Sequence, residues 1–158
     1  MSIIIEYLVP FILILSVLVF VHEYGHFWVA RRCGVFVETF SIGFGRELFG
    51  WHDRRGTRWR VAILPLGGYV RMRGDASEAS TPDRAALAHM TAEERARSFP
   101  AQPVMNRIAI VAAGPAANIL FAIFAMAITF MTVGQPYTPA VVGEVVAESP
   151  AESAGLQA

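Results

Sequence analysis

The fold of this chain is decided by the stretch YLVPFILILSVLVFVHEYGHFWVA, residues 7–30. Residues 7–21 carry no charge, and the motif HEYGH at residues 22–26 then interrupts an apolar run that continues to Ala30. As one helix, these 24 residues span roughly 36 Å at 1.5 Å per residue, and the hydrocarbon core of a bilayer is about 30 Å thick. The stretch therefore predicts a membrane helix that carries polar side chains inside the bilayer.

A second apolar run, Ile108 to Val133, has no charge over 26 residues and is also long enough to span. A signal peptide is the alternative for the first run, but it would begin with basic residues and end in a cleavage site of small residues. Here the start carries Glu6, and the basic residues Arg31 and Arg32 follow the run. Together with 54% hydrophobic and 16% charged residues, the pattern predicts two retained membrane helices.

The charges of this chain are distributed unevenly although its net charge is zero. All 13 basic residues are arginines between Arg31 and Arg107, where eight acidic residues leave a net charge of +5, and residues 132–158 carry three glutamates and no base. The positive-inside rule places segment 33–107 in the cytoplasm and both termini outside. Because acidic residues are interspersed among these arginines, we expect contact with the lipid bilayer and no nucleic acid.

The HEYGH motif has the spacing of a zinc hydrolase. Residues four apart on a helix share a face, so His22 and His26 point their imidazoles toward one place, with Glu23 beside them. Two neutral imidazoles can hold a metal that lowers the pKa of water, and the glutamate can take the proton. Cobalt, nickel or iron would also suit these ligands. The alternative is that neighbouring helices satisfy the three polar groups, which are costly in lipid unless they are paired or ligated.

The rest of the chain divides at changes of residue pattern. Residues 35–40 and 58–70 alternate in the manner of strands, residues 51–57 form a polar turn, and residues 82–97 favour short helices with a capping box of Thr91 and Glu94. Gly25 would let another backbone approach closely, and Gly114-Pro115 predicts a kink in the second helix. The lone Cys33 excludes an internal disulfide. The expected segments are 1–32, 33–73, 74–107, 108–133 and 134–158.

Several motifs in the same order resemble the site-2 protease family of intramembrane zinc metalloproteases, including its bacterial regulator-of-sigma-E branch. They are HEYGH, RRCGVFVETFSIGFG, PLGGYV, AAGPAAN and VVGEVVAESPAESAGL. The resemblance implies that His22 and His26 ligate Zn²⁺ and that Glu23 is the general base. It also implies that Gly43, Phe44 and Gly45 belong to a β-hairpin-like element that binds an extended substrate, and that Asn118 lies near the metal, where it holds the substrate.

The fold class implied by this resemblance is an α-helical integral membrane protein of the bacterial inner membrane with periplasmic termini. Its two transmembrane helices would be joined by a cytoplasmic segment with a small membrane-associated β-sheet, and residues 134–158 would begin a PDZ domain. The implied substrates are transmembrane segments of single-pass proteins such as anti-sigma factors, cut after an earlier cleavage, and remnant signal peptides. An extended substrate can add to the edge of such a sheet by backbone pairing.

One departure from the family concerns the third zinc ligand. Family members supply an aspartate from a Leu-Asp-Gly type motif on a later helix, and the sequence of 158 residues has no such motif. Catalytic zinc takes three protein ligands, so the chain is expected to be the N-terminal part of a longer protein and inactive alone. The alternatives are a non-catalytic adaptor with a PDZ-like binding region, which the intact Glu23 disfavours, and a metal carrier, which two spans disfavour.

Overall fold

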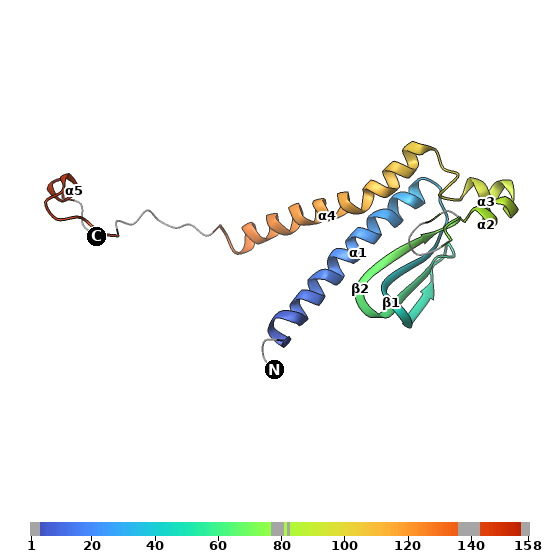
Figure 1. The fold of residues 1–158 in the computed structure, drawn as a ribbon, viewed down its shortest axis with the longest axis horizontal. Helices are drawn as coiled ribbons and strands as arrows, with labels where there is room; N and C mark the ends of the chain where they lie inside the picture. Colours follow the sequence, from blue (N-terminus) through green and yellow to red (C-terminus); the bar gives the residue numbers. More distant parts are fainter. Residues whose placement is uncertain (1–3, 77–80, 82, 136–142, 156–158) are drawn as a thin grey trace. The chain divides into compact units, whose positions relative to one another are not determined.

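The computed structural model describes residues 4–76, 81, 83–135 and 143–155 (Figure 1). Its elements in chain order are a π-helical turn η1 (Ile4–Leu8), α1 (Val9–Arg32), β1 (Val37–His52), β2 (Arg58–Met72), α2 (Arg84–His89), α3 (Ala92–Ala96), α4 (Val104–Thr132) and α5 (Pro150–Ser153). They fall into two units, residues 1–124 and 125–158. The first unit holds the sheet, α1 and most of α4, and therefore all the residues discussed below as a site.

The two long helices can each cross a membrane by length and composition. Ile4–Arg32 and Val104–Thr132 have 29 residues each, about 43 Å at 1.5 Å per residue. In the most apolar 18-residue window of each helix, 0% of the first helix and 11% of the second is buried inside the chain. Their apolar side chains therefore remain available to contact another apolar environment such as lipid. The second helix begins four residues before the run predicted from Ile108, because residues 104–107, which include the polar Asn106 and Arg107, form its first turn.

The sheet consists of two long antiparallel strands, β1 and β2, and each strand bends so that its two halves take part in different pairings. We call this arrangement a doubled hairpin. Residues 37–42 of β1 pair with residues 68–72 of β2 on one side, and residues 39–42 also pair with residues 58–61 on the other. Residues 47–52 of β1 pair with residues 58–62, so they form one edge, and residues 68–72 form the other. The predicted strand at 35–40 is thus shorter than β1, which continues through the glycine-rich SIGFG segment because β2 supplies pairing partners on both sides.

The core joins the end of α1 to the sheet and to the start of α4. Its buried members are Phe27, Ala30, Val35, Val37, Phe40, Val70, Met72 and Ile110. The α1 and α4 helices meet closely at Gly25: a β-carbon there would lie 2.8 Å from Cβ of Ala117 and 2.9 Å from the carbonyl carbon of Ala113. The close approach expected of Gly25 is therefore present, in the manner of small residues at helix–helix interfaces in membranes.

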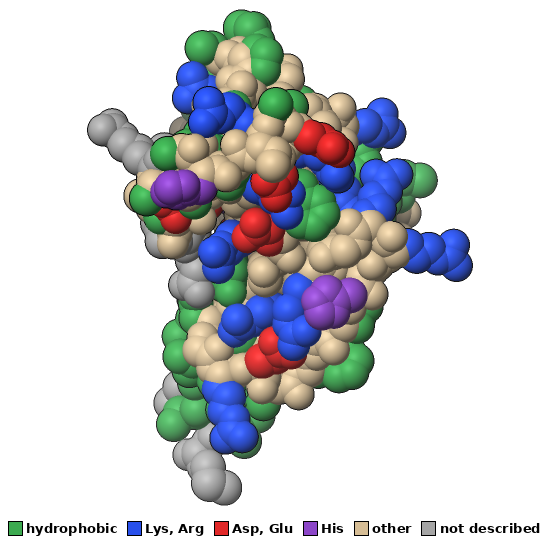
Figure 2. Space-filling view, turned by 90° about the vertical axis from the view of Figure 1, so that its right-hand side faces the viewer, with side chains coloured by type: hydrophobic (Ala, Val, Ile, Leu, Met, Phe, Trp, Pro, Cys, Tyr) green, Lys and Arg blue, Asp and Glu red, His purple; other side chains and the backbone are tan. Residues whose placement is uncertain are grey.

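The connector between the sheet and α4 contains the predicted short helices. Thr91 and Glu94 form the predicted capping box at α3: the Thr91 side chain accepts from the Glu94 backbone N–H, and the Glu94 side chain accepts in return. Viewed from this end, Figure 2 shows arginine side chains spread over the face with acidic side chains between them. In the second unit, Ser149 caps α5. Much of the predicted PDZ-like segment, residues 136–142 and 156–158, lies outside the described residues.

Candidate metal and catalytic site

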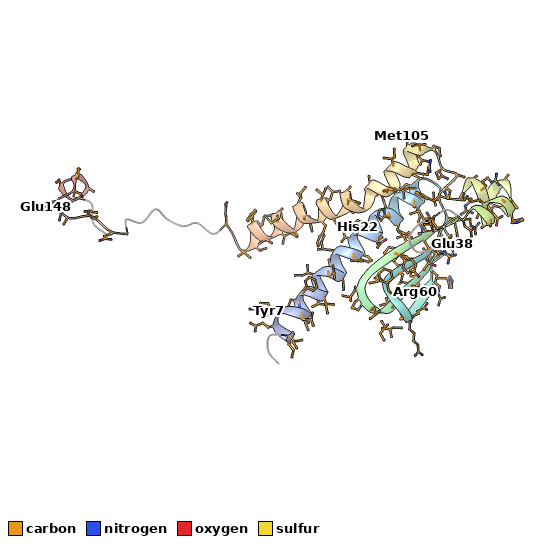
Figure 3. The ribbon with its side chains drawn as sticks, in the orientation of Figure 1. Tyr7, His22, Glu38, Arg60, Met105 and Glu148 are labelled. Atoms are coloured by element: carbon orange, nitrogen blue, oxygen red, sulfur yellow. The ribbon has the colours of Figure 1, made fainter. Side chains whose placement is uncertain are left out.

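Two imidazoles of α1 point at the same spot on α4. The rings of His22 and His26 are 4.8 Å apart between centroids, with planes at 77°. A β-carbon placed on Gly114 would lie 2.8 Å from Nε2 of His22 and nearer still to Nε2 of His26. Both Nε2 atoms therefore face the backbone of Gly114, where any larger residue would intrude (Figure 3 shows His22 where α1 and α4 run side by side).

The orientation of His26 is set by a backbone carbonyl of α4. Its Nδ1 lies 2.7 Å from the Ile110 carbonyl oxygen. Because a carbonyl oxygen can only accept, Nδ1 carries the hydrogen and donates it. In the neutral ring Nε2 then has a free lone pair, which is the state that a metal ligand requires.

The corresponding contact of His22 is made by Asn118, which lies four residues after Gly114 on the same helix. The amide nitrogen of Asn118 is 3.3 Å from Nδ1 of His22, and its buried oxygen has no hydrogen-bond partner among the described residues. Nitrogen and oxygen exchange places by a half-turn of the amide, and the choice between them follows from the hydrogen bonds. With the oxygen facing Nδ1, His22 donates to it and presents a free lone pair at Nε2, as His26 does.

Glu23 lies under the edge strand of the sheet. A β-carbon on Gly68 of β2 would be 3.2 Å from Cγ of Glu23 and 3.1 Å from Cγ1 of Val19. Within the described part of the chain, no hydrogen-bond donor engages the Glu23 carboxylate. The carboxylate is therefore available to a water molecule, and the glycine above it lets a backbone come close.

The SIGFG segment is connected to this edge through Phe44. Gly43 and Gly45 adopt φ values of +85° and +86°, which residues with side chains rarely adopt. The Phe44 ring stacks on Tyr69, with 6.1 Å between centroids, and it also covers Gly67, where a β-carbon would lie 3.2 Å from Phe44 Cζ. Gly43 and Gly45 themselves have no described contact with the histidines or Glu23.

The turn at Gly45 is tied down by Arg60. Its Nη2 donates to the Gly45 carbonyl at 2.6 Å, and its Nη1 donates to the Tyr69 hydroxyl at 3.1 Å. One guanidinium thus joins the glycine-rich turn of β1 to the edge segment of β2 that covers Glu23. These contacts connect the glycine-rich turn through β2 to the backbone next to Glu23.

The imidazoles of His22 and His26 fit two of the protein ligands of a metal site. Among the described residues, no group of three His, Cys, Asp or Glu side chains is placed to hold a metal ion.

Sequence reasoning missed three parts of this site: Gly114, the Ile110 carbonyl and Gly68. The glycine doublet at 67–68 and the Gly-Pro pair at 114–115 were the available signals, but only the packing of α4 on α1 assigns them to the site.

A family model and several named proteins match most of this chain. The model of "Peptidase family M50" matches residues 10–154. The chain is 50% identical over 151 residues to the Agrobacterium fabrum protein named "Putative zinc metalloprotease Atu1380", covering 96% of this chain and 40% of that protein. It is 48% identical over 158 residues to metalloprotease MmpA of Caulobacter vibrioides, covering 95% and 40%.

A similar match joins the chain to regulator of sigma-E protease RseP of Escherichia coli, with 48% identity over 149 residues, 94% of this chain and 31% of that protein. The chain thus spans less than half the length of these relatives. The family model covers most of the residues from α1 to α5, including α1, which carries His22 and His26, and α4, which these histidines face. The chain therefore belongs to peptidase family M50, the site-2 protease family.

Proposed function

We propose that this chain carries part of the catalytic centre of an intramembrane zinc metalloendopeptidase of the bacterial inner membrane. The observation that carries the proposal is the convergence of the two Nε2 atoms of His22 and His26 on Gly114, with Nδ1 of His26 already bound to a carbonyl. Imidazoles held in this way are typical of zinc sites. The names of the relatives, which include zinc metalloproteases and RseP, agree with it.

In this proposal His22 and His26 hold Zn²⁺ through Nε2, and the third protein ligand comes from outside residues 1–158. When bound, zinc supplies Lewis acidity that activates water and polarises a carbonyl. The Ile110 carbonyl and the Asn118 amide keep the two rings oriented. Without a third ligand, residues 1–158 alone are inactive.

Glu23 acts as the general base of the reaction. Its carboxylate accepts a proton from the attacking water and delivers it to the nitrogen of the scissile peptide bond, so that the amine can leave. The carboxylate has no competing donor among the described residues, and it lies next to the edge of the sheet at Gly68. A substrate strand paired with that edge would pass over the carboxylate.

The substrate in this proposal is a transmembrane segment that has left the helical state. A helix shields its peptide bonds through its own hydrogen bonds, so cleavage needs an extended segment whose backbone groups pair elsewhere. Residues 68–72 form a sheet edge that can supply this pairing. Gly43, Phe44 and Gly45 support the edge through Tyr69 and Gly67, and single-pass proteins such as anti-sigma factors, and remnant signal peptides, are the proposed substrates.

The site lies close to one membrane surface. His26 precedes Arg32, the last residue of α1, by six residues, about 9 Å along a helix. We place Arg31, Arg32 and segment 33–107 on the cytoplasmic side and both termini in the periplasm, because every basic residue lies in residues 31–107. Water from that side would have a short path to Glu23. Residues 134–158 would begin a PDZ domain on the periplasmic side.

The test uses the protein expressed from its complete reading frame, as wild type and as Glu23→Gln. Both proteins are purified, their zinc content is measured, and each is incubated with a tagged single-pass substrate that lacks its external domain. We expect about one zinc in both proteins and cleavage by the wild type alone. Metal in both without cleavage by either would support an adaptor or carrier, and cleavage by Glu23→Gln at the wild-type rate would refute the assigned mechanism.

A further inference from the structure

A hollow of about 450 Å³ lies where α1 ends against the turn between β1 and β2. Its lining combines three aromatic and three arginine side chains: Tyr24, Phe27, Trp28, Arg31, Arg32 and Arg55. The volume is in the range of sites that bind small molecules. None of these three arginines belongs to the candidate metal and catalytic site described above.

The aromatic rings hold two of these arginines in place. The guanidinium carbon of Arg31 lies 4.3 Å from the centroid of Phe27, and that of Arg32 lies 4.4 Å from the centroid of Trp28. Stacking on a ring uses the face of the guanidinium and leaves N–H groups at its edge free to donate. Trp28 remains 48% exposed and Tyr24 remains 42% exposed, as is usual for aromatic residues at a membrane surface.

The hollow has a surplus of positive charge. Arg31 is paired with Asp53 and also donates to the Thr57 hydroxyl at 2.8 Å. For Arg32 and Arg55, no carboxylate within the described ranges lies at ion-pair distance. Two cations therefore face a concave site without a counter-ion from this part of the chain, which is the arrangement that recognises phosphate oxygens.

We propose that this hollow binds the phosphate headgroup of an anionic phospholipid, such as phosphatidylglycerol. The proposal uses the membrane placement of α1 given under the proposed function, and it does not depend on hydrolysis. A lipid is the occupant because Arg31 and Arg32 are the last residues of an apolar helix whose side chains are largely exposed. The acyl chains would lie along α1 while the phosphate reaches the arginines.

The test is lipid binding measured by native mass spectrometry on the protein from the complete reading frame, with dioleoyl phosphatidylglycerol and dioleoyl phosphatidylcholine. The variant is Arg32→Gln/Arg55→Gln. The control is Arg46→Gln/Arg54→Gln, which removes the same charge from arginines outside the hollow; Arg54 is the direct chain neighbour of Arg55. Because each substitution removes a hydrogen bond between charged groups, worth about tenfold in affinity, the variant should bind phosphatidylglycerol about 100-fold more weakly.

The control and the wild type should bind phosphatidylglycerol equally, and all three proteins should bind phosphatidylcholine alike. Equal weakening in variant and control would show general charge attraction and overturn the site. Displacement of the lipid by equimolar glycerol phosphate would assign the hollow to a soluble phosphate compound and overturn the lipid. If the double variant is poorly folded by thermal melting, Arg32→Gln and Arg55→Gln are measured singly, with about tenfold loss expected for each. Zinc content, read on the same samples, separates failure here from failure of the protease proposal.

Discussion

Replacing Gly114 by alanine tests the convergence of the two histidines directly. The new methyl group would lie 2.8 Å from Nε2 of His22, against about 3.4 Å for ordinary contact, so this ring must move by roughly 0.6 Å. The displacement of His26 would be larger, because its Nε2 is nearer. Metal sites tolerate about 0.5 Å of misplacement, so we expect zinc affinity to fall 10- to 100-fold, as it does when support of a ligand is lost.

The assay for Gly114→Ala is competition for zinc with a chromogenic chelator in detergent, accompanied by thermal melting. Gly143→Ala, outside any helix, is the control for the added methyl group alone, since a β-carbon at Gly143 has nothing within 4 Å. Alanine also favours a helix over glycine by about 1 kcal/mol, so loss of zinc with little loss of melting temperature is the expected pattern. Zinc affinity within twofold of the wild type would show that Nε2 of these histidines does not face the metal.

Two further predictions concern residues around the site. Asn118→Ala should weaken zinc binding about tenfold because His22 loses its partner at Nδ1. Asn118→Asp should retain zinc, since a carboxylate also accepts a hydrogen bond from Nδ1. Unchanged zinc affinity with lost cleavage in Asn118→Ala would instead assign Asn118 to substrate binding. Burial raises the pKa of Asp53, but the hydrogen bond from Arg31, with others, holds that pKa below its usual 3.8. The stabilisation by Asp53 is therefore complete above about pH 3.8 and is lost as the pH falls through the lower native value. Asp53→Asn should lower the free energy of unfolding by about 1 kcal/mol at pH 7, measured by denaturant-induced unfolding. This difference from the wild type should vanish in acid. A difference in unfolding free energy that persists well below about pH 3.8 would refute the ion-pair account.

The sequence alone predicted the features that depend on neighbours along the chain. Spacing of four residues places His22 and His26 on one helix face wherever the helix lies, because 3.6 residues make a turn. The capping box of Thr91 and Glu94 is equally local, and it is present in the structure. Two long apolar runs predict helices able to span a membrane, since a segment in lipid must form its backbone hydrogen bonds internally. The resemblance to site-2 proteases rested on the same local motifs, and the family match confirms it.

Only the tertiary structure decided which residues surround His22, Glu23 and His26. The contacts of His26 with Ile110 and of His22 with Asn118 join residues 84 and 96 positions apart. The same packing puts Gly114 opposite both rings, and the doubled hairpin puts Gly68 over Glu23. No periodicity encodes these pairings, because they follow from how two helices and a sheet pack through small residues such as Gly25. A local pattern sets the direction of a side chain within its own element, and the packing of elements sets what that side chain meets.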